Sequence, residues 1–370
     1  MNNNLISDSM NEDIRVEVFD QLNEDIKNIW KENEKISGCY FFQTSSFIEL
    51  LIASNKNTQK KIIVIWIKNE LFAIFPLEIK NIYSIKVLQW IGTNESDYCG
   101  AFFINQNKYK ISKQNFSFIW KTAVKKIKKF DLIFLKNQPE FFTNGRNPFV
   151  EYLDNFFSSK NYFVELPSDY SDYTNKLKVN HNNYKRFNRY KKKMLSNYNL
   201  EFIKLDAPKN IEIEKIVHEK MKQLDKKKIS HFFNKNLINF YINLKNKNPS
   251  NFVVNNLLIN GELINSSISF IFNKRFYYFI TVTYGKKYNN FPVGKIFISY
   301  LIKWCIKNNI NTFDFGQGDE EYKKFFSNKT NKLFAHVGYC SSKGLLISKL
   351  IYLYKFLKFV KIKNFFRKCS

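Results

Sequence analysis

Three strand-like runs separated by tight polar turns constrain the fold of this chain more than any other feature. Residues 251–284, NFVVNNLLINGELINSSISFIFNKRFYYFITVTY, turn at Asn260–Gly261 and again at Asn273–Lys274. Asn-Gly is typical of two-residue hairpin turns, so the runs pair as antiparallel strands. A helix-like segment, KIFISYLIKWCIKNN, and a further strand, NTFDFG, follow. Hairpin strands followed by a helix and another strand predict a sheet covered by helices.

The first half of the chain has the same plan. KIIVIWI (61–67) and LFAIFPLEI (71–79) form a predicted hairpin around Asn69–Glu70, after the helix-like SSFIELLIASN. A helix over 116–130 and a buried strand, DLIFL (131–135), come next. In the second half a basic helix (173–196), the strand NLEFIKL and helices over 211–228 and 235–244 precede the hairpins. The shared order predicts a tandem duplication of an α/β (α+β) unit.

The length of the chain agrees with two domains. A chain of 370 residues is longer than one ordinary domain. Loop-forming residues gather in ELPSDYSDY (165–173), which places the boundary near Pro167. We expect domains over 1–166 and 167–343, followed by a basic tail over 344–370.

The charge is informative only where it is clustered. The formal net charge is +27, but Lys, Asn, Ile, Phe and Tyr are abundant along the whole chain, as codon bias in an AT-rich genome would produce. Two clusters stand out from this background: Lys176 to Lys193, and the C-terminus, where no acidic residue follows Glu321.

Cysteine and histidine do not predict a metal site. The five cysteines and four histidines, His231 among them, are scattered without CxxC or metal-ligand spacing. Neither a GxSxG elbow nor a Walker loop is present. From the cysteine and histidine spacing we expect no metal cofactor. The polar N-terminus does not resemble a signal peptide, so we expect a cytoplasmic protein.

The tail LLISKLIYLYKFLKFVKIKNFFRKCS (345–370) mixes large apolar and basic residues. Lysines interrupt its apolar runs, which makes it unsuitable as a membrane span. It fits a helix lying in an anionic membrane interface, at the inner membrane face, or a terminal helix packed on the domain with its lysines outward.

The turn before the long helix, KKYNNFPVGK, is the first candidate site. A helix that starts near Lys295 presents unpaired backbone N–H groups, which suit a pyrophosphate. Gly294 would let a phosphate approach closely, with Val293 and Lys295 beside it. An ordinary strand-to-helix turn would look the same.

The second candidate is FDFGQGDEEYKKFF (313–326). Asp314 alternates with two Phe residues in a strand, so its side chain points away from theirs. Asp319, Glu320, Tyr322 and Lys323 follow two glycines and start a predicted helix. Acids in a first helical turn favour the helix dipole, but acids, a tyrosine and a lysine beyond a strand end also suit proton transfer.

The third candidate is the basic helix KLKVNHNNYKRFNRYKKKM (176–194). Tyr184, Phe187 and Tyr190 share one helical face and are expected to be buried, leaving Arg186 and Arg189 in water. The cations form either a solvated face or a wall for a phosphorylated ligand: coenzyme A, a nucleotide-sugar, an undecaprenyl-type phosphate or RNA.

Taken in order, these segments resemble the GNAT-like acyltransferases of the CelD type, known from cellulose-biosynthesis clusters and related to the FemAB peptidyltransferases. That family has a terminal block of the form FDF..GDExYK, which the chain matches at Asp314, Gly318, Asp319, Glu320, Tyr322 and Lys323. The first half agrees more loosely, through FFQTSSFIELL and WIGTNESDYCGAFF.

The resemblance implies two tandem GNAT-like domains, each a mixed twisted sheet flanked by helices. Acetyl-CoA or another acyl-CoA would be the co-substrate, held near Val293, Gly294 and Lys295. Asp319 or Glu320 would deprotonate the acceptor and Tyr322 would protonate the leaving thiolate, with Asp314 in the same site. Contacts to phosphate or acceptor are expected from Lys323, Arg186 and Arg189.

Three functions follow from these features. The first is acyl transfer to a sugar or cell-envelope polysaccharide precursor. The second keeps the fold but takes an aminoacyl-tRNA as donor, as in FemAB relatives, with the cluster from Lys176 to Lys193 on the RNA. The third is a non-catalytic peripheral membrane or glycan-binding scaffold.

Overall fold

The computed structural model describes residues 13–104, 109, 111–180, 182–226 and 237–368. The chain forms two compact units, the first of Met1–Ser158 with Lys332–Ser370 and the second of Ser159–Asn331. It enters the second unit along strand β9 (Asn155–Glu165) and leaves it along β15 (Lys329–Tyr339). This division differs from the predicted 1–166, 167–343 and 344–370, because β15 returns the chain to the first unit.

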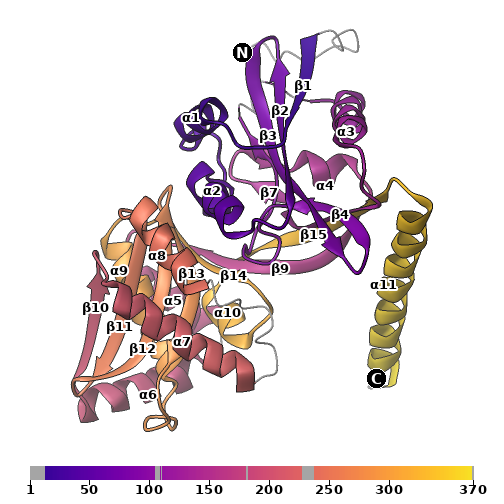
Figure 1. Ribbon diagram of the computed structural model, residues 1–370. Coiled ribbons are helices and arrows are strands. Elements are labelled where there is room, and N and C mark those ends of the chain that lie inside the picture. The colour runs from indigo at the N-terminus through magenta and orange to yellow at the C-terminus, as the bar shows by residue number, and fades with distance from the viewer. Residues whose placement is uncertain (1–12, 105–108, 110, 181, 227–236, 369–370) are drawn as a thin grey trace, which may run out of the picture. The chain divides into compact units, whose positions relative to one another are not determined.

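The first unit is a sheet covered by helices on both sides. Its strands are β1 (Ile14–Phe19), β2 (Gln59–Ile67), β3 (Glu70–Ile82), β4 (Ile85–Trp90), β5 (Phe102–Phe103), β6 (Leu132–Pro139) and the short pair β7 (Phe141–Phe142) and β8 (Gly145–Arg146). Its helices are α1 (Glu24–Asn33), the 3-10 turn η2 (Phe41–Gln43), α2 (Ser45–Ser54), α3 (Lys113–Ile127), α4 (Pro148–Tyr152) and α11 (Ser342–Lys368). Figure 1 shows α1 and α2 on one side of the sheet and α3 and α4 on the other.

The strand order of this sheet is β1-β2-β3-β4-β6-β15. Neighbours are antiparallel except β4 and β6, which pair in parallel through Val87–Leu132 and Leu88–Ile133. The crossover between these two strands contains α3, as a parallel connection requires.

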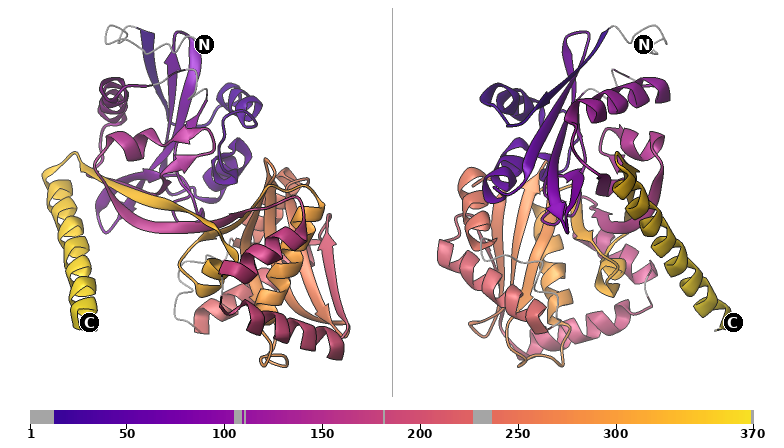
Figure 2. Two further views of the ribbon diagram at one scale, coloured as in Figure 1. Left: turned by 180° about the vertical axis from the view of Figure 1, so that it is seen from behind. Right: turned by 45° about the vertical axis from the view of Figure 1, so that its right-hand side comes forward.

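The second unit repeats this plan. Its remaining strands are β10 (Leu200–Leu205), β11 (Phe252–Ile259), β12 (Glu262–Phe272), β13 (Arg275–Thr283) and β14 (Thr312–Gln317). Its helices are α5 (Tyr170–Asn180), α6 (Tyr184–Asn197), α7 (Asn210–Lys226), α8 (Leu237–Lys247), α9 (Val293–Lys307) and α10 (Glu321–Phe326). Figures 1 and 2 show α7 and α8 on one face of the sheet and α5, α6 and α9 on the other.

The order of this sheet is β9-β14-β13-β12-β11-β10, with β13 and β14 in parallel and every other pair antiparallel. Element by element, β10-α7-α8-β11-β12-β13-α9-β14 matches β1-α1-α2-β2-β3-β4-α3-β6. The predicted fold class is therefore confirmed: both halves are mixed sheets flanked by helices, in tandem.

In each unit, the strand next to the parallel pair comes from the other half of the sequence. β9, the first strand to follow β6 with more than two residues, pairs with β14, whereas β15, which follows β14, pairs with β6. Each unit thus completes its sheet with a strand from the opposite half of the sequence. This exchange explains why a boundary placed at a loop near Pro167 cuts through the second unit.

The predicted hairpin turns are present. Asn260 and Gly261 both have positive φ, 52° and 79°, and Asn273 and Lys274 have φ of 49° and 56°. Two adjacent left-handed residues define the two-residue turn whose twist fits paired strands. Asn and Gly adopt that conformation at low cost, which explains the Asn260–Gly261 pair.

The basic helix differs from its prediction. Instead of one helix over 173–196, the chain forms two helices, α5 and α6. Helix α6 begins at Tyr184, directly after its N-cap residue Asn183. The predicted strand DLIFL extends to Pro139 as β6, and a short helix, α4, forms over Pro148–Tyr152. His231 lies outside the described residues.

Candidate active site

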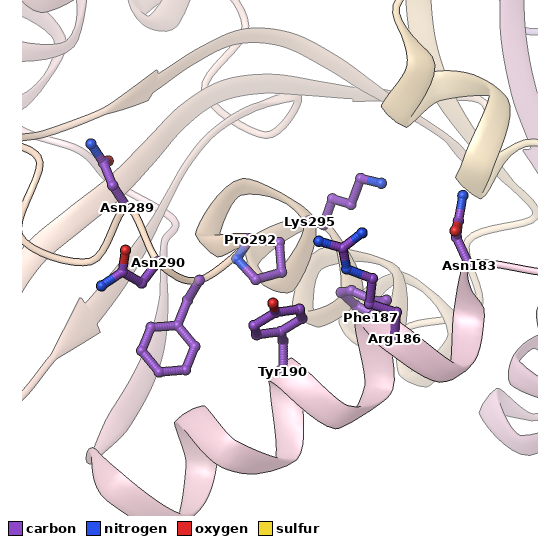
Figure 3. A pocket seen from close by; sticks show the side chains of 9 residues that line it. Asn183, Arg186, Phe187, Tyr190, Asn289, Asn290, Pro292 and Lys295 are labelled. Atoms are coloured by element: carbon purple, nitrogen blue, oxygen red, sulfur yellow. The ribbon is translucent and has the colours of Figure 1, made fainter.

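A pocket in the second unit brings two of the predicted segments together. It has a volume of about 380 Å³ and lies between α6 and the loop that enters α9. Figure 3 shows its lining side chains, which are Asn183, Arg186, Phe187, Tyr190, Asn289, Asn290, Phe291, Pro292 and Lys295. None of these nine is acidic, and Arg186 and Lys295 supply positive charge from separate helices.

The apolar face of α6 fixes the orientation of its cations. Phe187 is buried, with its ring centroid 5.6 Å from that of Phe325 and 6.0 Å from that of Phe326. Residues 186 and 189 flank this face and are exposed. Both guanidinium groups stack on the Tyr190 ring, at 5.8 Å for Arg186 and 5.7 Å for Arg189. Only Arg186 of the two lines the pocket.

The start of α9 forms the opposite wall. Its N-cap is Pro292, which provides no side-chain hydrogen bond, whereas the matching helix α3 is capped by Ser112, whose Oγ accepts from the Asn115 N–H at 3.2 Å. A side-chain carbon added at Gly294 would meet no atom within 4 Å, so Gly294 borders open space. The first turn of α9 is therefore available to an anion.

Lys295 is the second cation of the pocket. Its Nζ lies 4.5 Å from the centroid of the Phe325 ring. Burial lowers the pKa of Lys295, and the nearby carboxylate of Glu321 acts in the opposite direction. A bound phosphate would offset the cost of burying this ammonium group, because opposite charges favour the charged form. The geometry and the charge together suit a pyrophosphate.

The two parallel strands part near this pocket-forming loop. β13 pairs with β14 only through Arg275–Tyr277 and Thr312–Asp314, although both strands continue. Further along β13, the carbonyl groups of Thr281 and Thr283 accept hydrogen bonds from Lys220 Nζ (3.3 Å) and Gln223 Nε2 (2.9 Å) of α7. On this stretch, side chains of α7 bond to backbone carbonyl groups of β13.

A bulge marks the same stretch of β13. The register with β12 slips between Ile268 and Ser269, which leaves Phe279 outside the ladder. Bulges of this kind are frequent beside active sites because they take backbone groups out of regular pairing. The bulge lies on the stretch of β13 that no longer pairs with β14.

Asp314 lies in the interior, away from the pocket. It is fully buried, and its Oδ2 accepts from Arg275 Nε at 2.7 Å while Oδ1 accepts from the Gly316 N–H at 2.8 Å. The neighbouring Phe313 and Phe315 are core residues, as their alternation predicts. The position of Asp314 gives no support to a catalytic role, because its oxygens already serve an internal ion pair.

Asp319 lies on the surface beside β9. It accepts a hydrogen bond from the Tyr162 hydroxyl and is 3.6 Å from Lys160 Nζ and 3.5 Å from Lys324 Nζ. The hydrogen bond from Tyr162, followed by the two lysines, lowers the pKa of Asp319. A carboxylate with a lowered pKa is a weaker base than an ordinary one.

Lys323 has an internal partner. Its buried Nζ donates to the backbone carbonyl of Gln317 and lies 3.0 Å from Oε2 of Glu320, the N-cap residue of α10. Gly318, between them, has φ of +132°, a conformation that favours glycine. Lys323 therefore holds the loop before α10, and its predicted contact with phosphate finds no support in this geometry.

Tyr322 is half-buried on α10. Its ring packs against the core of the unit, with its centroid 6.4 Å from that of Phe315. Among the predicted catalytic residues, Tyr322 is the one whose side chain is partly buried and partly exposed to solvent. Within the described residues, no three His, Cys, Asp or Glu side chains come together as metal ligands do.

Lys191 is an unusual cation that the sequence does not single out. Its Nζ donates to Ser299 Oγ at 2.9 Å and lies 5.4 Å from the Tyr300 ring centroid. Burial, and then the charge of Lys303, lower the pKa of Lys191 to about 8. Within a run of three lysines the sequence does not distinguish Lys191, because its burial depends on contacts with α9.

Replacing Lys191 by methionine is expected to stabilise the protein at pH 7, by about 1 kcal/mol after allowance for solvent screening. An unfolded lysine titrates near pH 10.4, so between pH 8 and 10 the unfolded state binds more protons and wild-type stability rises with pH. Below pH 8 both states are charged and the burial cost is complete. Urea denaturation should show that Lys191→Met gains more unfolding free energy over wild type at pH 7 than at pH 9.5. Lys192→Met, at an exposed position, is the control. An equal gain at both pH values contradicts this explanation.

Comparison with known proteins agrees with the geometry of the second unit. Residues 181–324 match the family model described as an acetyltransferase (GNAT) domain, a range that contains the whole pocket and α10 up to Lys324. A search of curated proteins gave no significant match. Residues 181–324 are thus similar to a GNAT acetyltransferase domain, which supports an acyltransferase.

Among solved structures, FemX is similar in fold over nearly the full chain. FemX has 9% sequence identity and a TM-score of 0.58, over 90% of this chain and 99% of that chain. A tandem GNAT protein from the clavulanic acid biosynthesis pathway has 6% identity and a TM-score of 0.46, covering 88% and 98%. L-PGS from Bacillus licheniformis has 11% identity and a TM-score of 0.46, covering 89% and 97%. At 9% identity, the likeness to FemX is one of fold alone.

Proposed function

We propose that the pocket of the second unit binds the phosphates of an acyl-CoA and that the protein transfers its acyl group to an amine or hydroxyl. The observation that carries this proposal is the convergence of Arg186, Lys295 and the uncapped start of α9 on one pocket. Arg and Lys side chains with free backbone N–H groups are what a pyrophosphate requires. The bound donor would supply an activated thioester.

From this pocket, the reacting end would lie along the open edge of β13. Backbone groups near Phe279, which the bulge removes from the ladder, are suited to polarise a carbonyl oxygen. Tyr322, half-buried on α10, is suited to give a proton to a leaving thiolate. Asp319 and Glu320 are the proposed proton acceptors, and the hydrogen bond from Tyr162 lowers the pKa of Asp319.

The acceptor is proposed from the resemblance to CelD-type enzymes: a sugar or a cell-envelope polysaccharide precursor. Two of the four predicted catalytic positions, Asp319 and Glu320, have exposed side chains, which permits a bulky acceptor to approach. The supporting feature is access, and the identity of the acceptor rests on the resemblance.

Binding of acetyl-CoA is the experiment that tests the donor. Saturating acetyl-CoA is expected to raise the unfolding temperature by several degrees, since a ligand at about 100 times its Kd adds roughly 2.7 kcal/mol. Acetyl-pantetheine, which has the thioester but lacks the pyrophosphate and the nucleotide, should give no shift at equal concentration. A shift of equal size with both compounds, or with neither, would contradict phosphate binding by the pocket.

Tyr322→Phe is expected to lower kcat about 100-fold while the Kd for acetyl-CoA stays unchanged, because only the proton donor is lost. Steady-state transfer to an amine acceptor, combined with calorimetric binding, separates these quantities. Tyr300→Phe, half-buried on α9, is the matched control and should keep the wild-type rate. Full activity in the Tyr322→Phe variant would exclude this role.

A second candidate donor is an aminoacyl-tRNA. The observation in its favour is that residues 185, 186, 189, 192 and 193, all lysine or arginine, are exposed on α6. Contacts of this kind with RNA backbone lose affinity steeply as salt rises. Absence of tRNA binding at 50 mM salt would exclude this donor. A non-catalytic scaffold is excluded by any measured acyl transfer.

A further inference from the structure

Helix α11 has one face packed on the first unit. Ile347 and Ile351 pack against the cluster of Val87, Leu132 and Val337, and Ser348 between them is buried. Toward the next turn, the Lys355 ammonium lies 4.7 Å from the ring centroid of Phe156. The helix therefore has a defined orientation, with this face turned inward.

The opposite face of α11 exposes a stripe of leucines. Leu346, Leu350 and Leu353 are 62%, 54% and 52% exposed, and their spacing places them on one side of the helix. Tyr354 next to them is also exposed. Scattered surface leucines are common, but a continuous apolar stripe indicates a surface that binds something. Figures 1 and 2 show α11 continuing beyond the strands that it contacts.

The charge of α11 has a single sign. Residues 342–368 contain eight lysines and arginines and no aspartate or glutamate. By helical spacing, Lys343 and Lys349 flank the leucine stripe on its two sides, and both residues are exposed. The stripe is thus an apolar surface with a positive border.

These two properties select one occupant. A second copy of the chain would bring eight like charges against eight, without acids to pair with them. RNA would satisfy the lysines but leave the leucines in water. No helix in the described ranges is long and apolar enough to cross a bilayer. An anionic lipid surface accepts both the leucines, among its acyl chains, and the lysines, at its phosphates.

We propose that α11 is a membrane-binding helix that lies in the interface of anionic lipids through Leu346, Leu350 and Leu353, with Lys343 and Lys349 at the headgroups. This contact is made by the first unit and is independent of the acyltransfer proposed for the second.

Vesicle flotation of the full chain tests this proposal. At 0.1 M salt the protein is expected to float with vesicles of phosphatidylcholine containing 30% phosphatidylglycerol and to remain unbound with phosphatidylcholine alone. The variant L346Q/L350Q/L353Q, altered only on the exposed face, should bind at least 10-fold more weakly, and K343E/K349E should show a similar loss. Ile36→Gln and Tyr83→Ser, at other exposed apolar positions of the same unit, are controls that should bind like wild type.

Three results would overturn the proposal. One is equal flotation with neutral and anionic vesicles, and a second is unchanged flotation of the leucine variant. The third is a dimer, seen by analytical ultracentrifugation, that the leucine substitutions dissociate while vesicle binding is absent. Acetyl-CoA binding, measured on the same samples, should be unchanged in every variant, so loss of donor binding and loss of lipid binding are distinguished.

Discussion

Arg186→Ala is expected to weaken acetyl-CoA binding by about 10- to 100-fold, since one charge-assisted hydrogen bond to phosphate is worth roughly 1.5–3 kcal/mol. Arg186 lines the pocket together with Lys295, at the uncapped end of α9. Adding Lys295→Ala should bring the loss to about 100-fold or more, because each of the two cations would make its own contact with the proposed anion from a separate helix. Isothermal calorimetry at constant ionic strength measures both losses.

Arg189→Ala is the matched control for this experiment. Arg189 is on the same helix, is exposed like Arg186 and stacks on the same Tyr190 ring at nearly the same distance. It differs in one respect, that it does not line the pocket. Its replacement should change the Kd less than twofold. Equal losses for Arg186→Ala and Arg189→Ala would mean that long-range charge, and not the pocket, attracts the ligand.

The comparison between the halves adds a prediction of stoichiometry to the same titration. Helix α3 occupies the place of α9 in the first unit, but Ser112 caps its N-terminus. A side-chain cap uses the backbone donors that an anion would need. One acetyl-CoA per chain is therefore the expected result.

Local sequence signals were sufficient for much of the fold. Asn260–Gly261 and Asn273–Lys274 turn where predicted because their backbone preferences are local. The alternation of Phe313 and Phe315 likewise predicts their burial. The repeated order of elements predicted the tandem plan, since hydrophobic periodicity is a property of each segment.

Long-range partners were not predictable in this way. The partner of Asp314 is Arg275, 39 residues earlier, and only the parallel register of β13 and β14 brings them together. The exchange of β9 and β15 depends on pairing between distant segments, so a boundary at a loop missed it. The pocket combines α6 with the start of α9; each segment was recognised, but their meeting is a tertiary fact.

The assignment of the FDFGQGDEEYKKFF segment changes as a result. The part of the segment that lies in β14 has a structural role, because most of its side chains are buried. Lys323 also has a structural role, since its ammonium group donates a hydrogen bond to the Gln317 carbonyl. Tyr322 and the exposed acids remain the part that can meet a substrate. A segment that matches a family block thus contains residues with different tasks, which burial separates.

Asp314→Ala is expected to destabilise the second unit by about 3–5 kcal/mol, because it leaves the guanidinium of Arg275 buried without its carboxylate. Asp314 is fully buried, the Arg275 side chain is only 14% exposed, and their contact is 2.7 Å long. Urea denaturation followed by circular dichroism measures the loss. Asp319→Ala, which removes an exposed carboxylate of the same segment, should leave the stability of the second unit nearly unchanged.

The double variant R275M/D314L separates a structural from a catalytic role for Asp314. Replacing both partners of a buried pair with apolar side chains is often neutral, since neither is left as an uncompensated charge. We expect R275M/D314L to regain most of the stability lost in Asp314→Ala and, with it, acetyl transfer. A double variant that is stable, binds acetyl-CoA normally and fails to transfer would instead make Asp314 part of the chemistry, because only the carboxylate, and not the fold, would then be missing.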